Sequence, residues 1–146
     1  MELIQTGYVV SLFLCVGYAS IMGGRTGRTG SAIFLAATGL TALATLSDSA
    51  WDGTFYAIFA VDGACLLALV VLAIHSTRFW PIWAVGFQTV AVATHLATIW
   101  VPDLVPKAYQ ALLAFWSIPI LWVMVAGTRK DWIYQQARQQ RAATQA

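Results

Sequence analysis

Charged residues are scarce in this sequence. Only 10% of the 146 residues are Asp, Glu, Lys or Arg, whereas about 25% is usual in a soluble domain. Hydrophobic residues make up 60% of the chain. A soluble domain of this size leaves much of its surface in water and has no room to bury so many apolar side chains. The composition therefore excludes an ordinary soluble domain and predicts one domain surrounded by lipid.

Cysteines and catalytic patterns are also scarce. Cys15 and Cys65, the two cysteines, lie in apolar runs and lack the CxxC spacing of a zinc or redox motif. We interpret them as small buried residues, with a buried redox pair as the alternative. No group of Ser, Cys and His residues has a pattern typical of nucleophilic catalysis. We therefore expect a protein that is not an enzyme and that has no metal or other cofactor.

The apolar runs lack the alternation of apolar and polar residues that is typical of membrane β-strands. Because a bilayer core needs about 20 apolar residues per helix, the sequence predicts an all-α integral membrane protein, a bundle of five transmembrane helices. The predicted spans are about 3–22, 31–47, 55–75, 82–100 and 108–126. They form a transmembrane domain of residues 1–130, followed by a short, basic, Gln-rich cytoplasmic tail over 131–146. We expect the end of this tail, Gln135 to Ala146, to be a short amphipathic helix that frays.

Positive charge determines the expected orientation. The first basic residues, Arg25 and Arg28, follow the first apolar run, which favours a retained span with the N-terminus outside over a cleaved signal peptide. Five spans then place seven of the eight basic residues on the inner side, as the positive-inside rule requires. These seven are Arg25, Arg28, Arg78, Arg129, Lys130, Arg138 and Arg141, and Lys107 is the exception. We expect a cytoplasmic C-terminus and a location in the cell membrane, the bacterial inner membrane.

Small residues recur at every fourth position of the first span. They are Gly7, Ser11, Cys15, Ala19 and Gly23. Such a face lets helix backbones approach closely in lipid, so it predicts helix packing, either inside the bundle or in a dimer.

Two other features predict breaks in the helices. The glycine-rich segment 23–30 is expected to be a flexible basic loop, since it lacks the Gly-Lys-Ser/Thr ending of a phosphate-binding loop. Pro119 lies inside the fifth span and is expected to kink it.

Tryptophans lie near the predicted ends of the spans. Because Trp is enriched at membrane–water interfaces, we expect interface anchors at Trp51, Trp80, Trp83, Trp100 and Trp132.

Two ionisable residues inside the spans form the candidate site. Asp62 and His95 each lie about 8–10 Å below the outer end of antiparallel neighbouring spans, at about 1.5 Å per residue. They should therefore be neighbours. A charged residue at this depth is costly and normally has a partner. Gln88, Thr98 and Asp48 are the expected supporting polar residues. The pair is either a proton- or ion-linked site or a structural hydrogen bond that fixes helix register.

His75 does not belong to this site. It lies at the inner end of the third span, about 20 Å in depth from His95. The two histidines therefore cannot hold one haem iron between them.

Three functions remain open. The small soluble mass, the small-residue face and the aromatic anchors favour a non-enzymatic accessory or assembly subunit of a membrane complex. A small proton- or ion-linked transporter would use Asp62 and His95, although five spans do not divide into two equal repeats. The third is an anchor subunit of a redox complex. The expected partners are the lipid bilayer and either other membrane proteins or a second copy. Topology explains the basic residues of the tail, so nucleic-acid binding is not predicted.

Overall fold

The computed structural model describes the backbone of residues 2–47, 51–100 and 106–145, and the side chains of 6–46, 56–97 and 117–144. The described residues form five α-helices and no strand, which confirms the all-helical prediction. The helices are α1 (Glu2–Met22), α2 (Gly24–Ser47), α3 (Trp51–His75), α4 (Trp80–Trp100) and α5 (Pro106–Gln145). Two described segments, Gly24–Leu46 and Tyr56–His75, are long and apolar enough to cross a membrane, and a shorter apolar helix covers Thr6–Met22.

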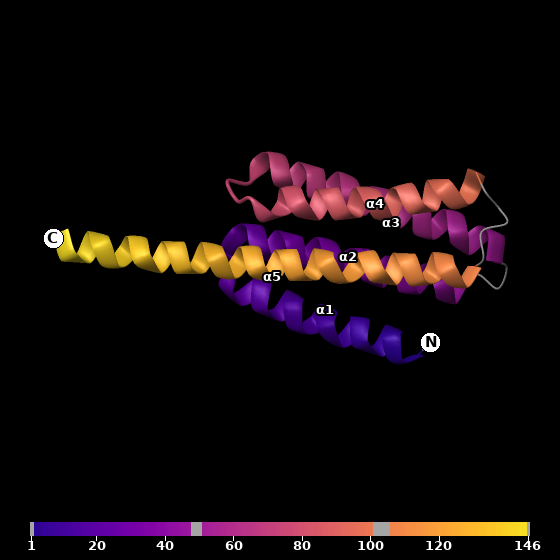
Figure 1. Cartoon of the computed structure of the whole chain (residues 1–146), viewed down its shortest axis with the longest axis horizontal. Helices are drawn as coiled ribbons and strands as arrows, with labels where there is room; N and C mark the ends of the chain where they lie inside the picture. The colour runs from indigo at the N-terminus through magenta and orange to yellow at the C-terminus, as the bar shows by residue number, and fades with distance from the viewer. Residues whose placement is uncertain (1, 48–50, 101–105, 146) are drawn as a thin grey trace.

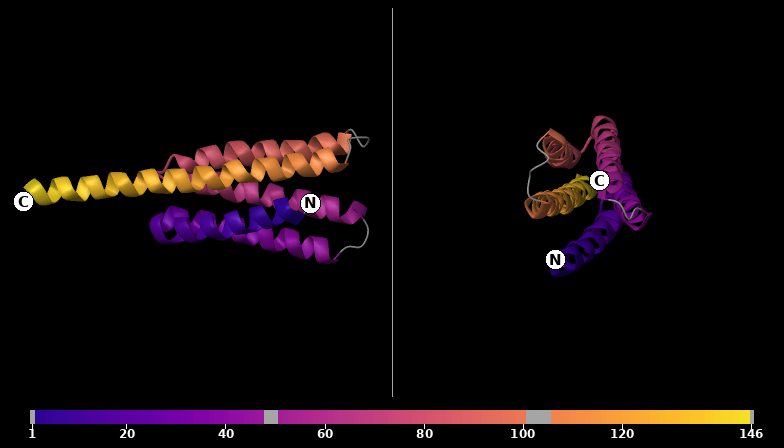
Figure 2. Two further views of the ribbon diagram at one scale, coloured as in Figure 1. Left: turned by 60° about the horizontal axis from the view of Figure 1, so that its bottom comes forward. Right: turned by 90° about the vertical axis from the view of Figure 1, so that its right-hand side faces the viewer.

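The helices run side by side along one axis, and consecutive helices are antiparallel (Figure 1). Helix α3 packs against α2 and α4, and α5 packs against both α4 and α1. The end-on view in Figure 2 shows α5 between α1 and α4. The described turn at Ser76–Phe79 and the α1–α2 junction lie at the end of the bundle from which α5 projects (Figure 1).

A small core joins all five helices, whereas much of the outer surface is apolar. Each helix contributes to the core, which includes Leu12, Phe34, Leu69, Trp80, Leu121 and Met124. Large apolar side chains are exposed around the bundle, among them Phe13, Leu14, Leu43, Leu67, Ile82 and Trp122. An apolar exterior of this extent marks a surface that contacts lipid or other proteins.

The expected flexible loop over residues 23–30 is wrong. Helix α2 begins at Gly24, whose φ of 57° makes the turn out of α1. The glycines allow close approach instead: a Cβ on Gly23 would lie 2.7 Å from the Gly27 Cα of α2, and one on Gly27 would collide with the Ala19 carbonyl oxygen of α1. Glycine here allows two helix backbones to touch.

Helix α5 is longer than the predicted fifth span. Its 40 residues correspond to about 60 Å at about 1.5 Å per residue. It contains Pro119, and Figure 1 shows it continuing past the bundle as one helix. The boundary expected at residue 131 therefore lies within a continuous helix.

Candidate functional site

Asp62 of α3 and His95 of α4 lie in direct contact. The Nε2 atom of His95 is 2.7 Å from Oδ2 of Asp62. The His95 side chain is fully buried, whereas 24% of the Asp62 side chain is exposed. The antiparallel pairing of α3 and α4 brings together residues that are 33 positions apart, as the depth argument expected.

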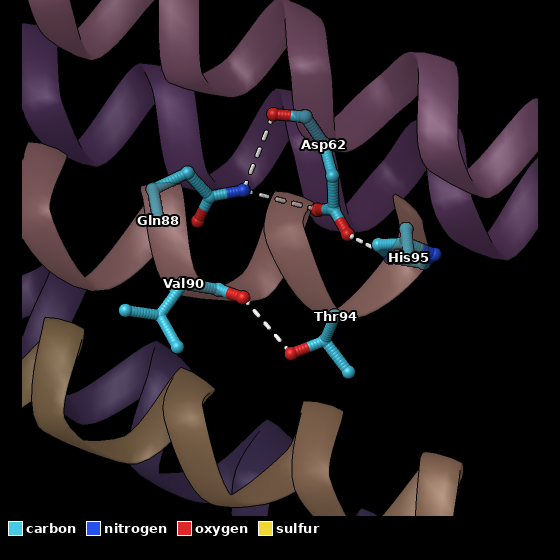
Figure 3. A network of polar contacts seen from close by, with 5 residues as sticks. All are labelled: Asp62, Gln88, Val90, Thr94 and His95. Atoms are coloured by element: carbon cyan, nitrogen blue, oxygen red, sulfur yellow. Dashed lines mark hydrogen bonds and ion pairs between the residues drawn. The ribbon is translucent and has the colours of Figure 1, made fainter. Parts of the chain in front are cut away.

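Gln88, one of the expected supporting residues, completes this cluster. Its side-chain amide donates to the other carboxylate oxygen of Asp62 at 3.2 Å and to the Asp62 main-chain carbonyl at 3.3 Å. Gln88 and His95 are seven positions apart and therefore lie on the same face of α4. Figure 3 shows both side chains pointing at Asp62 from α4, while Thr94 on the same helix bonds back to the Val90 carbonyl.

Two apolar neighbours on α3 lie next to the polar cluster. The Phe59 ring, one turn before Asp62, lies 5.9 Å from the His95 ring between centroids. Cys65, nearly one turn after Asp62, is buried in the core. Both carboxylate oxygens thus have a partner in a largely apolar setting, where such hydrogen bonds are strong and the loss of one partner is costly.

The remaining members of the expected site lie elsewhere. The backbone of Asp48 and the side chain of Thr98 are outside the described residues. His75 ends α3 and its Nδ1 atom is 2.9 Å from the Val71 carbonyl oxygen. It lies 13 residues from Asp62, or about 20 Å along the helix, so the two histidines are well separated. Among the described residues, no group of three or more His, Cys, Asp or Glu side chains could hold a metal ion.

The prediction of an interface anchor at Trp80 is wrong, because its side chain is 3% exposed. Its ring fits against two glycines: a Cβ on Gly30 would lie 2.5 Å from the ring atom Cη2, and one on Gly127 would collide with the Trp80 Cβ. Trp80 therefore joins α2, α4 and α5. The position near a predicted helix end suggested an anchor, whereas the two distant glycines that accommodate the ring give no such signal in the sequence.

The other predicted anchors differ in exposure. Trp83 is 55% exposed on α4, and Trp132 is partly exposed on α5. The side chains of Trp51 and Trp100 lie outside the described residues.

The small-residue face of α1 divides into two halves. Ala19 is fully buried, and Gly23 approaches both α2 and the Thr128 side chain of α5. Ser11 and Cys15 are partly exposed. Gly7 is exposed, and beyond its own helical turn no atom of the described residues lies within 4 Å of the position that a Cβ would take there. The inner half packs within the chain, and the outer half is open at Gly7.

A second set of polar contacts holds the end of the bundle from which α5 projects. The hydroxyls of Thr26 and Ser76 are 3.2 Å apart and join α2 to the α3–α4 turn. Arg78 in that turn lies 3.3 Å from the Asp131 carboxylate of α5. These contacts bring together the parts of the chain that carry Arg25, Arg28, Arg78, Arg129 and Lys130.

The chain matches no protein-family model, no curated protein and no solved structure. Its function must therefore be argued from its own residues.

Proposed function

We propose that the protein crosses the bacterial inner membrane five times, with its N-terminus outside, and serves as a non-enzymatic accessory or assembly subunit of a membrane complex. The observation that carries the proposal is the contrast between surface and interior. Large apolar side chains cover the outside, whereas Gln88 and His95 are buried. A chain that exposes apolar groups and buries polar ones is suited to lipid and to apolar helix contacts.

The length and charge of α5 support this orientation. Residues 106–127 correspond to about 33 Å of helix, close to the bilayer core of about 30 Å. Arg129 and Lys130 follow directly, at the end where Arg78 contacts Asp131. Basic residues gathered at one end of the bundle favour that end as the cytoplasmic one.

The satisfied polar cluster favours a structural role for Asp62. Its carboxylate binds Gln88 and His95 on the neighbouring helix, which fixes α3 against α4. The open outer half of the small-residue face of α1 then offers a place for a helix of another protein, because a Cβ at Gly7 would lie within 4 Å of no packing atom among the described residues.

Extraction of the protein from the membrane by a polymer, without detergent, tests this proposal because it keeps membrane complexes together. Native mass spectrometry of polymer-enclosed membrane discs should show a tagged full chain together with a different protein at fixed stoichiometry. Gly7→Leu should release that protein, and Gly86→Leu should retain it, because Gly86 is also exposed and open but lies on α4. A single copy of the wild-type chain in every disc would contradict the proposal.

Proton-linked transport is the second candidate, favoured by the partial exposure of Asp62 beside the fully buried His95. An intramembrane carboxylate that contacts an imidazole is a common arrangement in proton relays. In liposomes, Asp62→Asn should abolish a pH-dependent flux while the helical content is retained. An absence of flux for protons and common ions in wild type and variant alike would reject this candidate.

A further inference from the structure

We propose that the groove between α4 and α5 binds one phospholipid with an anionic head group from the cytoplasmic leaflet. The inference rests on the proposed orientation. The groove has a volume of about 720 Å³, within the range of about 300–1,000 Å³ that is typical of ligand sites. Its lining divides into an apolar part and a polar mouth.

The apolar part follows the two helices into the bundle. Phe79, Trp83 and Phe87 line it from the turn and α4, and Val123 lines it from α5. Trp83 and Phe87 are four positions apart and therefore share one helix face. Because Phe79 and Trp83 are well exposed, this wall is open to an acyl chain from the side of the bundle.

The polar mouth lies at the end where the basic residues gather. Lys130, Asp131 and Tyr134 line it from α5, and Thr77 lines it from the turn. The groove thus changes from apolar to polar in the direction in which a lipid of the cytoplasmic leaflet changes from tail to head group.

Charge at the mouth selects the head group. The Asp131 carboxylate is neutralised by Arg78 at 3.3 Å, so it does not repel an anion strongly. The exposed Lys130 ammonium adds a positive charge, and Arg129 adds another beside it. Tyr134 and Thr77 supply hydroxyls that can donate to a phosphate. A zwitterionic head group would gain less from this charge than an anionic one.

Native mass spectrometry of the purified full chain, titrated with phosphatidylglycerol or phosphatidylcholine, tests the site. The wild type should hold one phosphatidylglycerol more tightly than phosphatidylcholine. Lys130→Gln should weaken phosphatidylglycerol binding about fivefold, the effect expected of one basic residue near an anionic surface. Arg141→Gln is the matched control: it removes the same charge from an exposed position of α5 outside the groove. Its binding should equal that of the wild type.

Two further variants separate charge from shape. Asp131→Asn should tighten phosphatidylglycerol binding, because Arg78 loses its partner and becomes available to the phosphate. Trp83→Ala should weaken the binding of both lipids, because it removes the apolar wall. Circular dichroism of each variant checks that the helices are retained.

Equal affinity of the wild type for the two lipids would overturn the inference, and so would equal losses in Lys130→Gln and Arg141→Gln. A dimer that neither lipid displaces would indicate that a second copy of the chain occupies the groove, and this result would also overturn the inference. A failure of lipid binding can be distinguished from a failure of the proposed function. The proposed function is tested by the release of a partner protein in Gly7→Leu, and Gly7 lies on α1, on the other side of α5 from the groove.

Discussion

Two regions hold the helices together in different ways. In the Asp62 cluster, hydrogen bonds from Gln88 and His95 join α3 to α4. At the Trp80 junction, a single ring fits against Gly30 and Gly127 and joins α2, α4 and α5 by shape alone. In lipid, close packing and interhelical hydrogen bonds replace the hydrophobic effect as the forces between helices. This chain uses both forces, hydrogen bonds in the Asp62 cluster and close packing at the Trp80 junction.

The junction should be the more sensitive region, because packed backbone and Cβ atoms cannot move aside. A methyl group at Gly127 would collide with the Trp80 Cβ. Gly127→Ala should therefore lower the free energy of unfolding by about 3 kcal/mol, the upper part of the usual range for overpacking. Denaturant titration in mild detergent, followed by circular dichroism, measures this loss.

The control for this prediction is Gly86→Ala, where no atom lies within 4 Å of the new Cβ. It should leave stability unchanged or raise it by up to about 1 kcal/mol through helix propensity. If Gly127→Ala costs as much in a Trp80→Gly background, which lacks the Cβ, as in the wild type, Trp80 is not the cause and the junction is wrongly described.

The Asp62 cluster should contribute less. A double-mutant cycle of Asp62→Ala and His95→Ala should give a coupling energy of about 0.6–1.7 kcal/mol, the range measured for interhelical hydrogen bonds in a membrane protein. Thr89→Val is a suitable control, because the Thr89 hydroxyl bonds only to the Val85 carbonyl of its own helix among the contacts described. A coupling near zero would show that the hydrogen bonds do not hold α3 against α4.

A buried polar group next to the junction in the chain, Thr128, should have the opposite effect. The buried hydroxyl of Thr128 has no hydrogen-bond partner among the described residues. An unsatisfied buried polar group costs about 1–3 kcal/mol, so Thr128→Val should stabilise the protein by about 1 kcal/mol. The same unfolding titration measures the gain. A loss of stability would mean that the hydroxyl has a partner, and the packing of α5 against Gly23 would then depend on a polar bond as well as on shape.

The two regions also differ in how far the sequence predicts them. An Asp and a His inside apolar runs are conspicuous, and the helical rise is enough to predict that Asp62 and His95 meet. The junction gives no local signal, because Gly30, Trp80 and Gly127 are distant in the chain and each has an ordinary interpretation by itself. Tyr8 and Thr38, whose hydroxyls are 3.3 Å apart between α1 and α2, were missed for the same reason.

Two differences between the predicted and the observed helix ends have physical causes. The glycines at 23 and 27 suggested flexibility, but they allow α2 to begin against α1. The polar composition after Gly127 suggested a separate tail, but nothing in that segment breaks a helix, and Gln, Arg and Ala are good helix formers. Composition predicted the apolar segments of the helices and could not locate the ends of helices that continue beyond them.

The central claim is that five helices cross the membrane with the basic end inside, and thiol labelling in intact cells tests it most directly. In a background of Cys15→Ser and Cys65→Ala, a single cysteine is placed either at Glu2, which precedes the predicted first span, or at the exposed position of Thr77. Five spans predict that a membrane-impermeant maleimide labels Glu2→Cys from outside and labels Thr77→Cys only after the cells are opened. If α2 and α3 alone crossed the membrane, both positions would lie on the same side. Equal labelling of the two variants in intact cells would therefore contradict the account.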